Sequence, residues 1–169
     1  EAPGVLRAID KLPKIGRDGV RRELHNVAGA TPEQSQAILA LGDVTGDNDA
    51  VLAALPDIVG DSPTARAGVA SLTDLLAGVR AAGIAESRVR IDVSIARGLA
   101  YYTGTVFETF LDDLPGIGSV CSGGRYDDLA SLYTKQRLPG IGGSLGVDRL
   151  LAAMEELGRA DARAATADV

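Results

Sequence analysis

The chain has 169 residues and a formal net charge of −6, and 46% of its residues are hydrophobic but only 4% are aromatic. This composition predicts an aliphatic core, and the acidic balance argues against general nucleic-acid binding, which depends on clustered Lys and Arg. No apolar run approaches the roughly 18 residues that cross a bilayer, so we expect a soluble, cytoplasmic protein without a membrane partner.

Cysteine and histidine, two residue types that often take part in catalysis, occur once each. Cys121 is the only cysteine, which excludes an internal disulfide and a cysteine-based zinc cluster. We interpret it as a small buried hydrophobe. His25, the only histidine, lies in the other half of the chain on the expected polar edge of a helix. A structural role is therefore favoured over catalysis for both residues, and we expect no metal site.

Residues 1–87 have the pattern of a helical region. Apolar residues recur at helical spacing after Pro3, which suits a first helical turn. Gly16 interrupts this pattern, and we expect a second helix over residues 17–27 that Gly29 ends.

Three further helices are expected before residue 87. The segment T-P-E-Q from Thr31 is typical of a capping box with proline in the first turn. Asn48 is expected to cap a short helix that Pro56 ends. Ser62 is expected to cap a longer helix that runs to Gly83.

This first half is therefore interpreted as a small helical bundle or insertion without a recognisable chemical site. Its basic residues form a loose cluster, which we interpret as a solvated face in preference to a phosphate contact. The cluster consists of Lys11, Lys14, Arg17, Arg21 and Arg22.

The pattern changes to strands at Arg88. Residues 89–95 alternate between apolar and polar, which predicts a strand with one buried face. Further strands are expected over residues 103–111 and, after a turn, residues 117–121. Because short turns join these strands, the pairing should be antiparallel, and the fold class α+β, with an antiparallel sheet and flanking helices.

Glycines are frequent in the rest of the chain. The stretch from Ser122 is expected to lead into a short helix with Leu129 and Leu132 facing inward. Residues 139–146 are expected to form a strand whose glycines leave one side bare, and Val147 to open the last amphipathic helix. Such a bare strand would let a flat ligand lie against the backbone.

The stretch R-G-L-A-Y-Y-T-G-T-V-F-E from Arg97 places a fixed cation just before two tyrosines, Tyr101 and Tyr102. A guanidinium and phenol hydroxyls of this kind can hold a small zwitterion. Together with S-G-G-R-Y-D-D-L from Ser122 and G-G-S-L-G-V-D-R-L from Gly142, this stretch resembles the histidyl-tRNA synthetase family of class II aminoacyl-tRNA synthetases.

The resemblance implies a domain organisation. Residues 1–87 would be the helical insertion region and residues 88–158 the second half of the class II catalytic core, and residues 159–169 are expected to fray. Class II motifs 1 and 2 and an anticodon-binding domain are not found, and the chain begins with Glu1 instead of Met. We therefore expect a fragment that is inactive alone.

The resemblance also implies roles for individual residues. Arg97 would lie between the carboxylate of histidine and the α-phosphate of ATP, and Tyr101, Tyr102 and Tyr126 would line the histidine pocket. The residues that would hold ATP are Arg149, Gly142, Ser144 and Gly146. Mg²⁺ would accompany ATP without an identifiable ligand, and the partners would be histidine, ATP and tRNA(His) in a homodimeric parent protein.

Two other interpretations stay open. The synthetase-like regulatory subunit of ATP phosphoribosyltransferase senses histidine without charging tRNA, and it also fits a chain without an anticodon domain. Ala100, where the family usually has Asp, mildly favours that alternative. The third interpretation is an α+β domain whose resemblances reflect packing alone.

Overall fold

The computed structural model describes residues 2–95 and 101–160. They belong to two compact units, Glu1–Thr105 and Val106–Val169. The domain division expected between residues 87 and 88 stays a proposal. The tail expected to fray lies, from residue 161 onward, outside the described residues.

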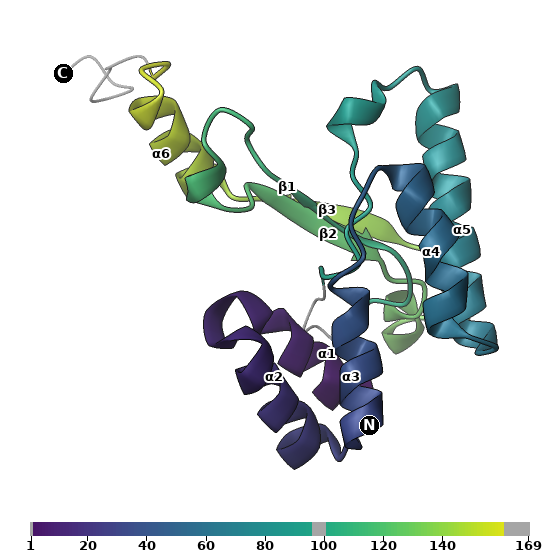
Figure 1. The fold of residues 1–169 in the computed structure, drawn as a ribbon. Helices are drawn as coiled ribbons and strands as arrows, with labels where there is room; N and C mark the ends of the chain where they lie inside the picture. The colour runs from purple at the N-terminus through teal and green to yellow at the C-terminus, as the bar shows by residue number, and fades with distance from the viewer. Residues whose placement is uncertain (1, 96–100, 161–169) are drawn as a thin grey trace. The chain divides into compact units, whose positions relative to one another are not determined.

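The described part of the first unit is built from helices, as expected. They are α1 (Ala2–Asp10), α2 (Leu12–Ala28), α3 (Pro32–Leu41), α4 (Asn48–Val59) and α5 (Pro63–Ala81), shown in Figure 1. One aliphatic cluster joins α1, α2 and α3, with Val20, Leu24 and Leu39 buried. A second cluster joins α4 and α5 through Val51, Leu55 and Leu76. None of the helices in the described residues has the length and apolar character needed to cross a membrane.

Local signals set most helix ends. Thr31 accepts a hydrogen bond from the Gln34 amide, and the Gln34 side chain accepts one from the Thr31 amide, which confirms the capping box. Gly29 ends α2 with a φ of 67°, a left-handed conformation that favours glycine. Gly16, with φ 65° and ψ 176°, interrupts the helical geometry within α2, as expected.

Two expected helix boundaries are wrong. Asp47, not Asn48, caps α4, because its carboxylate accepts the Ala50 amide at 2.8 Å. Pro56 lies inside α4, which continues to Val59. A proline lacks the N–H that an interior position donates, but it does not always end a helix.

The strand expected over residues 89–95 is absent from the described structure. A 3₁₀ turn, η1 (Glu86–Arg88), leads into an extended segment that packs on the helices. Ile91 is buried in the cluster of α4 and α5. The Asn48 side chain donates to the Val89 carbonyl at 2.9 Å and accepts from the Ile91 amide at 2.8 Å. The alternating pattern therefore reflects packing against helices, because a side chain takes the hydrogen bonds that a neighbouring strand would make.

The second unit contains a three-stranded antiparallel sheet, which confirms the α+β class (Figure 1). Its strands β1 (Val106–Thr109), β2 (Cys121–Arg125) and β3 (Ile141–Leu145) lie in that order. Helix α6 (Val147–Glu156) follows β3 after one residue, Gly146. The buried hydrophobic residues of the described part of this unit are Val120 and Ala153.

The connections of the sheet differ from the expected ones. A 3₁₀ turn, η2 (Pro115–Ile117), occupies the start of the expected third strand, and that strand begins only at Cys121. The glycines after Ser122 therefore lie within β2 instead of leading into a helix. The expected short helix is the 3₁₀ turn η3 (Leu129–Leu132), and its two leucines face outward, with Leu132 71% exposed. Residues three apart in a 3₁₀ helix lie on the same side, so the two leucines are exposed together.

Candidate functional site

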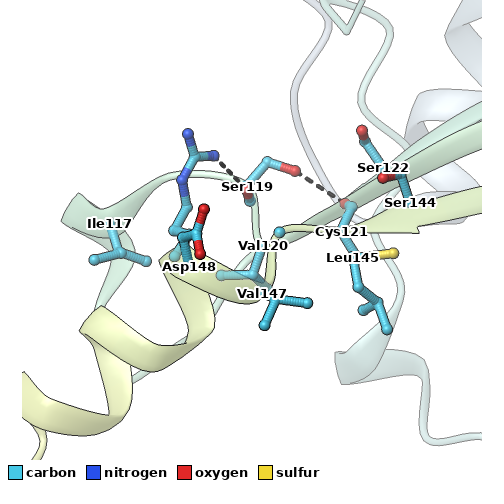
Figure 2. A pocket seen from close by; sticks show the side chains of 11 residues that line it. Ile117, Ser119, Val120, Cys121, Ser122, Ser144, Leu145, Val147 and Asp148 are labelled. Atoms are coloured by element: carbon cyan, nitrogen blue, oxygen red, sulfur yellow. Dashed lines mark hydrogen bonds between the residues drawn. The ribbon is translucent and has the colours of Figure 1, made fainter.

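The register of the sheet separates its side chains into two faces. Glu108 lies opposite Ser122, and Ser122 lies opposite Ser144, so these three residues form one cross-strand row. Cys121 and Leu145 point to the other face (Figure 2). The first face is therefore polar near the end of β3, where an ATP site is expected.

An open hollow of about 790 Å³ lies where β3 ends and α6 begins (Figure 2). Ser144, Gly146 and Arg149, three of the four residues expected to hold ATP, line this hollow. The Gly146 amide donates to the Val120 carbonyl at 2.9 Å, which fixes the turn between strand and helix. Secondary structure thus brings these three residues together around one space.

A backbone carbonyl holds the Arg149 side chain in place. Nη1 of Arg149 donates to the carbonyl oxygen of Ser119, which lies in the loop between η2 and β2. The hydroxyl of Ser119 in turn donates to the Cys121 carbonyl at 2.9 Å (Figure 2). A guanidinium has five N–H donors in a planar fork, so one bond to Ser119 leaves donors available for an anion.

The loop that holds Arg149 is a part of the site that the sequence did not reveal. Gly118, with φ 80° and ψ −166°, turns the chain just before Ser119, in a region that only glycine adopts without strain. The signal was present, because Gly116 and Gly118 follow Pro115 closely, which is typical of a turn and not of a strand.

Tyr126, expected in the histidine pocket, lies at the other end of β2. Its amide donates to the Gly140 carbonyl at 2.8 Å, which extends the pairing of β2 with β3. Asp127 accepts from Arg125 Nε at 2.8 Å and from the Gly140 amide at 3.3 Å. The hydrogen bond from Arg125 is the main reason why the pKa of Asp127 lies below its ordinary value, so this carboxylate is ionised at neutral pH.

Tyr101 and Tyr102 belong to the first unit. Their hydroxyl oxygens lie 3.3 Å apart and their ring centroids 4.5 Å apart. Neighbouring residues of a strand point to opposite faces, so this pairing requires the turn observed at Tyr101. Arg97 lies outside the described residues, and its predicted role stays a prediction.

Cys121 and His25 are the remaining residues that the sequence singled out. Cys121 is half-buried and lines the hollow, so it is less buried than expected. Nδ1 of His25 lies 3.4 Å from the Ala30 carbonyl at the end of α2, which agrees with a structural role. No group of three His, Cys, Asp or Glu residues suited to a metal ion occurs within residues 2–95 and 101–160.

Acidic partners neutralise much of the basic cluster. Lys11 pairs with Glu23 at 2.8 Å, and Arg21 pairs with Asp18 at 2.9 Å. Arg17 pairs with Asp43. Exposed pairs of this kind stabilise by about 0–1 kcal/mol each. They support the interpretation of the cluster as a solvated face.

The antiparallel sheet, leading through a glycine into a helix that carries Arg149, agrees with the part of a class II aminoacyl-tRNA synthetase core that the resemblance implies. The sequence pattern of the family "Histidyl-tRNA synthetase" matches residues 10–150. The chain therefore belongs to the histidyl-tRNA synthetase family.

Individual relatives agree with this assignment. The chain is 61% identical to a histidine–tRNA ligase of Rhodopirellula baltica, over 92% of this chain and 35% of the relative. It is 44% identical to a histidine–tRNA ligase of Wolinella succinogenes, over 98% of this chain and 38% of the relative. The chain thus spans little more than a third of these relatives.

Solved structures show the same fold. Histidyl-tRNA synthetase from Nostoc sp. PCC 7120 matches with a TM-score of 0.84 and 38% identity, over 94% of this chain and 37% of that one. A protein from Bacillus halodurans, described as an ATP phosphoribosyltransferase regulatory subunit/histidyl-tRNA synthetase, matches with a TM-score of 0.71 over 90% of this chain and 38% of that one. Its identity of 22% shows a shared fold alone, so it does not favour the regulatory alternative.

Proposed function

We propose that this chain is part of a histidine–tRNA ligase, which activates histidine with ATP and transfers the histidyl group to tRNA(His). The observation that carries the proposal is the 61% identity to a histidine–tRNA ligase, together with a hollow lined by Ser144, Gly146 and Arg149. The parent protein would act in the cytoplasm as a homodimer, and this chain alone would be inactive.

The chemistry would be an in-line displacement. A carboxylate oxygen of histidine attacks the α-phosphorus of ATP, and pyrophosphate leaves with the electron pair of the broken P–O bond. A hydroxyl at the 3′ end of the tRNA then attacks the histidyl carbonyl carbon, and AMP leaves. Reactions of this type depend mostly on positioning and charge neutralisation, which fixed guanidinium groups supply.

The binding residues would divide between the two substrates. Arg97 would neutralise charge between the histidine carboxylate and the α-phosphate, and Arg149, held by the Ser119 carbonyl, would bind ATP. Tyr101 and Tyr102 would line the histidine pocket, which their paired hydroxyl groups support.

The remaining assignments concern Tyr126, the metal and the glycines. Tyr126 would close another side of the histidine pocket. Ser144 and Gly146, which line the hollow, are expected to give ATP room, and the resemblance groups Gly142 with them. Mg²⁺ would accompany ATP, but the described residues offer no group of three metal ligands, so we assign the ion neither a ligand nor a step.

Histidine-dependent exchange between ATP and pyrophosphate in the complete ligase tests this proposal. Arg97→Ala should abolish adenylate formation and weaken histidine binding, because its guanidinium would neutralise charge between the histidine carboxylate and the α-phosphate. Arg90→Ala is the matched control, because Arg90 lies in the same segment with its side chain 77% exposed. Exchange at the wild-type rate in Arg97→Ala would refute the role of Arg97. A complete protein without exchange that modulates a phosphoribosyltransferase would support the regulatory alternative.

A further inference from the structure

The Tyr126 ring lies directly against two glycines at the start of β3. A Cβ atom on Gly140 would lie 2.6 Å from Tyr126 Cε2, and one on Gly142 would overlap the Tyr126 hydroxyl oxygen. Real Cβ atoms do not approach other atoms this closely, and the contacts are with a half-buried ring. Both positions therefore require glycine as long as Tyr126 occupies this place. We call Gly140 and Gly142 the glycine platform.

The glycine platform is separate from the hollow that contains Arg149. Ser144 and Gly146 line that hollow and Gly142 does not. The space next to the Gly142 Cα is filled by a side chain of the protein itself, so it is not left bare for a flat ligand. This contact distinguishes Gly142 from the other residues that the sequence pattern groups with it.

Hydrogen bonds to Gly140 fix the backbone of Tyr126 next to the glycine platform. The Tyr126 amide donates to the Gly140 carbonyl at 2.8 Å, and Asp127 accepts from the Gly140 amide at 3.3 Å. Arg125 in turn holds Asp127 at 2.8 Å. With its backbone fixed at this point, the ring can yield to an added methyl group only by rotating about its side-chain bonds, which moves it off the glycine platform.

We infer that Gly140 and Gly142 are positioning residues for Tyr126, and that Gly142 therefore serves histidine recognition and not ATP binding. This inference rests on the proposed function, in which Tyr126 closes the histidine pocket. A methyl group at either position would displace the ring from the pocket wall, and a misplacement of about 1 Å in a substrate-positioning group can cost roughly 100-fold in rate.

Pyrophosphate exchange in the complete ligase separates the two assignments. Gly142→Ala and Gly140→Ala should each raise the KM for histidine by about 10- to 100-fold and leave the KM for ATP unchanged. Gly116→Ala is the matched control, because its added Cβ meets no atom within 4 Å. A raised KM for ATP with an unchanged KM for histidine in Gly142→Ala would overturn the inference.

Tyr126→Phe provides a second test, because it removes only the hydroxyl group. Without this oxygen, the nearest atom to a Cβ on Gly142 is Cζ at 3.3 Å, whereas a Cβ on Gly140 still meets Cε2 at 2.6 Å. Tyr126→Phe should therefore rescue Gly142→Ala but not Gly140→Ala. If Gly142→Ala raises the KM for histidine equally in the wild-type and Tyr126→Phe backgrounds, the inference is contradicted.

Thermal stability gives a readout that does not depend on the proposed function. Gly142→Ala should lower the Tm in the wild-type background and leave it unchanged in a Tyr126→Ala background. An equal loss of Tm in both backgrounds would show that the ring is not the cause, and the inference would fail. If Tyr126→Ala leaves the KM for histidine unchanged, the proposed role of Tyr126 fails instead, whatever the result of the stability measurement.

Discussion

Replacing Asn48 with Ala should loosen the segment that leads from the helices toward Arg97. Asn48 is 7% exposed, and its side chain hydrogen-bonds to the backbone of Val89 and of Ile91. The substitution leaves a carbonyl and an amide without their partner, and a buried unsatisfied group costs about 1–3 kcal/mol. Because Val89 is only partly buried and water can reach it, we expect a total loss of about 2–4 kcal/mol.

Native-state hydrogen exchange at the Ile91 amide reports this loss, because the amide is protected while Asn48 accepts its hydrogen bond. At about 1.4 kcal/mol for each factor of ten, exchange should accelerate roughly 30- to 700-fold. Asn48→Asp keeps an acceptor for the Ile91 amide and should have a smaller effect. Asp47→Ala removes only the exposed cap of α4 and should cost about 1 kcal/mol. Exchange of Ile91 in Asn48→Ala within about threefold of wild type would show that Asn48 does not hold the segment.

Two further predictions concern the second unit. Gly118→Ala should raise the KM for ATP in the complete ligase about tenfold, because a side chain is strained at φ 80° and the loop would shift the carbonyl that holds Arg149. Gly116→Ala should have no such effect, and an effect of Gly118→Ala that persists in an Arg149→Ala background would contradict this explanation. Arg125 lowers the pKa of Asp127 in the folded state. The ionised Asp127 therefore stabilises the folded state at every pH above the ordinary carboxylate pKa, and this stabilisation is lost as the pH falls through the lower pKa of the folded state. The difference in Tm between wild type and Asp127→Asn should therefore be constant from pH 8 to about 5 and shrink in stronger acid, whereas a change near pH 7 would point to another group.

The sequence alone predicts those features that depend on neighbouring residues. The capping box at Thr31 and the left-handed glycine at Gly29 each involve contacts within one helical turn, and both are confirmed. The antiparallel pairing of the strands was also predicted, although the connections between them contain the 3₁₀ turns η2 and η3 and are longer than the turns that the sequence suggested. The family was also predicted from the sequence, because its motifs are short and have a fixed order, and the family pattern matches residues 10–150.

The tertiary structure decided the features whose partners lie far away in the chain. Asn48 is a residue type typical of helix caps, but its partner Ile91 is 43 residues away. Its hydrogen bonds are made where a strand was expected over residues 89–95. Gly142 has the pattern of a bare strand, yet the Tyr126 ring covers it. Local patterns record what a residue can do, whereas burial and hydrogen bonding to distant groups select which of these roles is used. For this chain, the sequence determined most of the helices, the antiparallel pairing and the family, and the packing of distant segments determined what each glycine and polar side chain contacts.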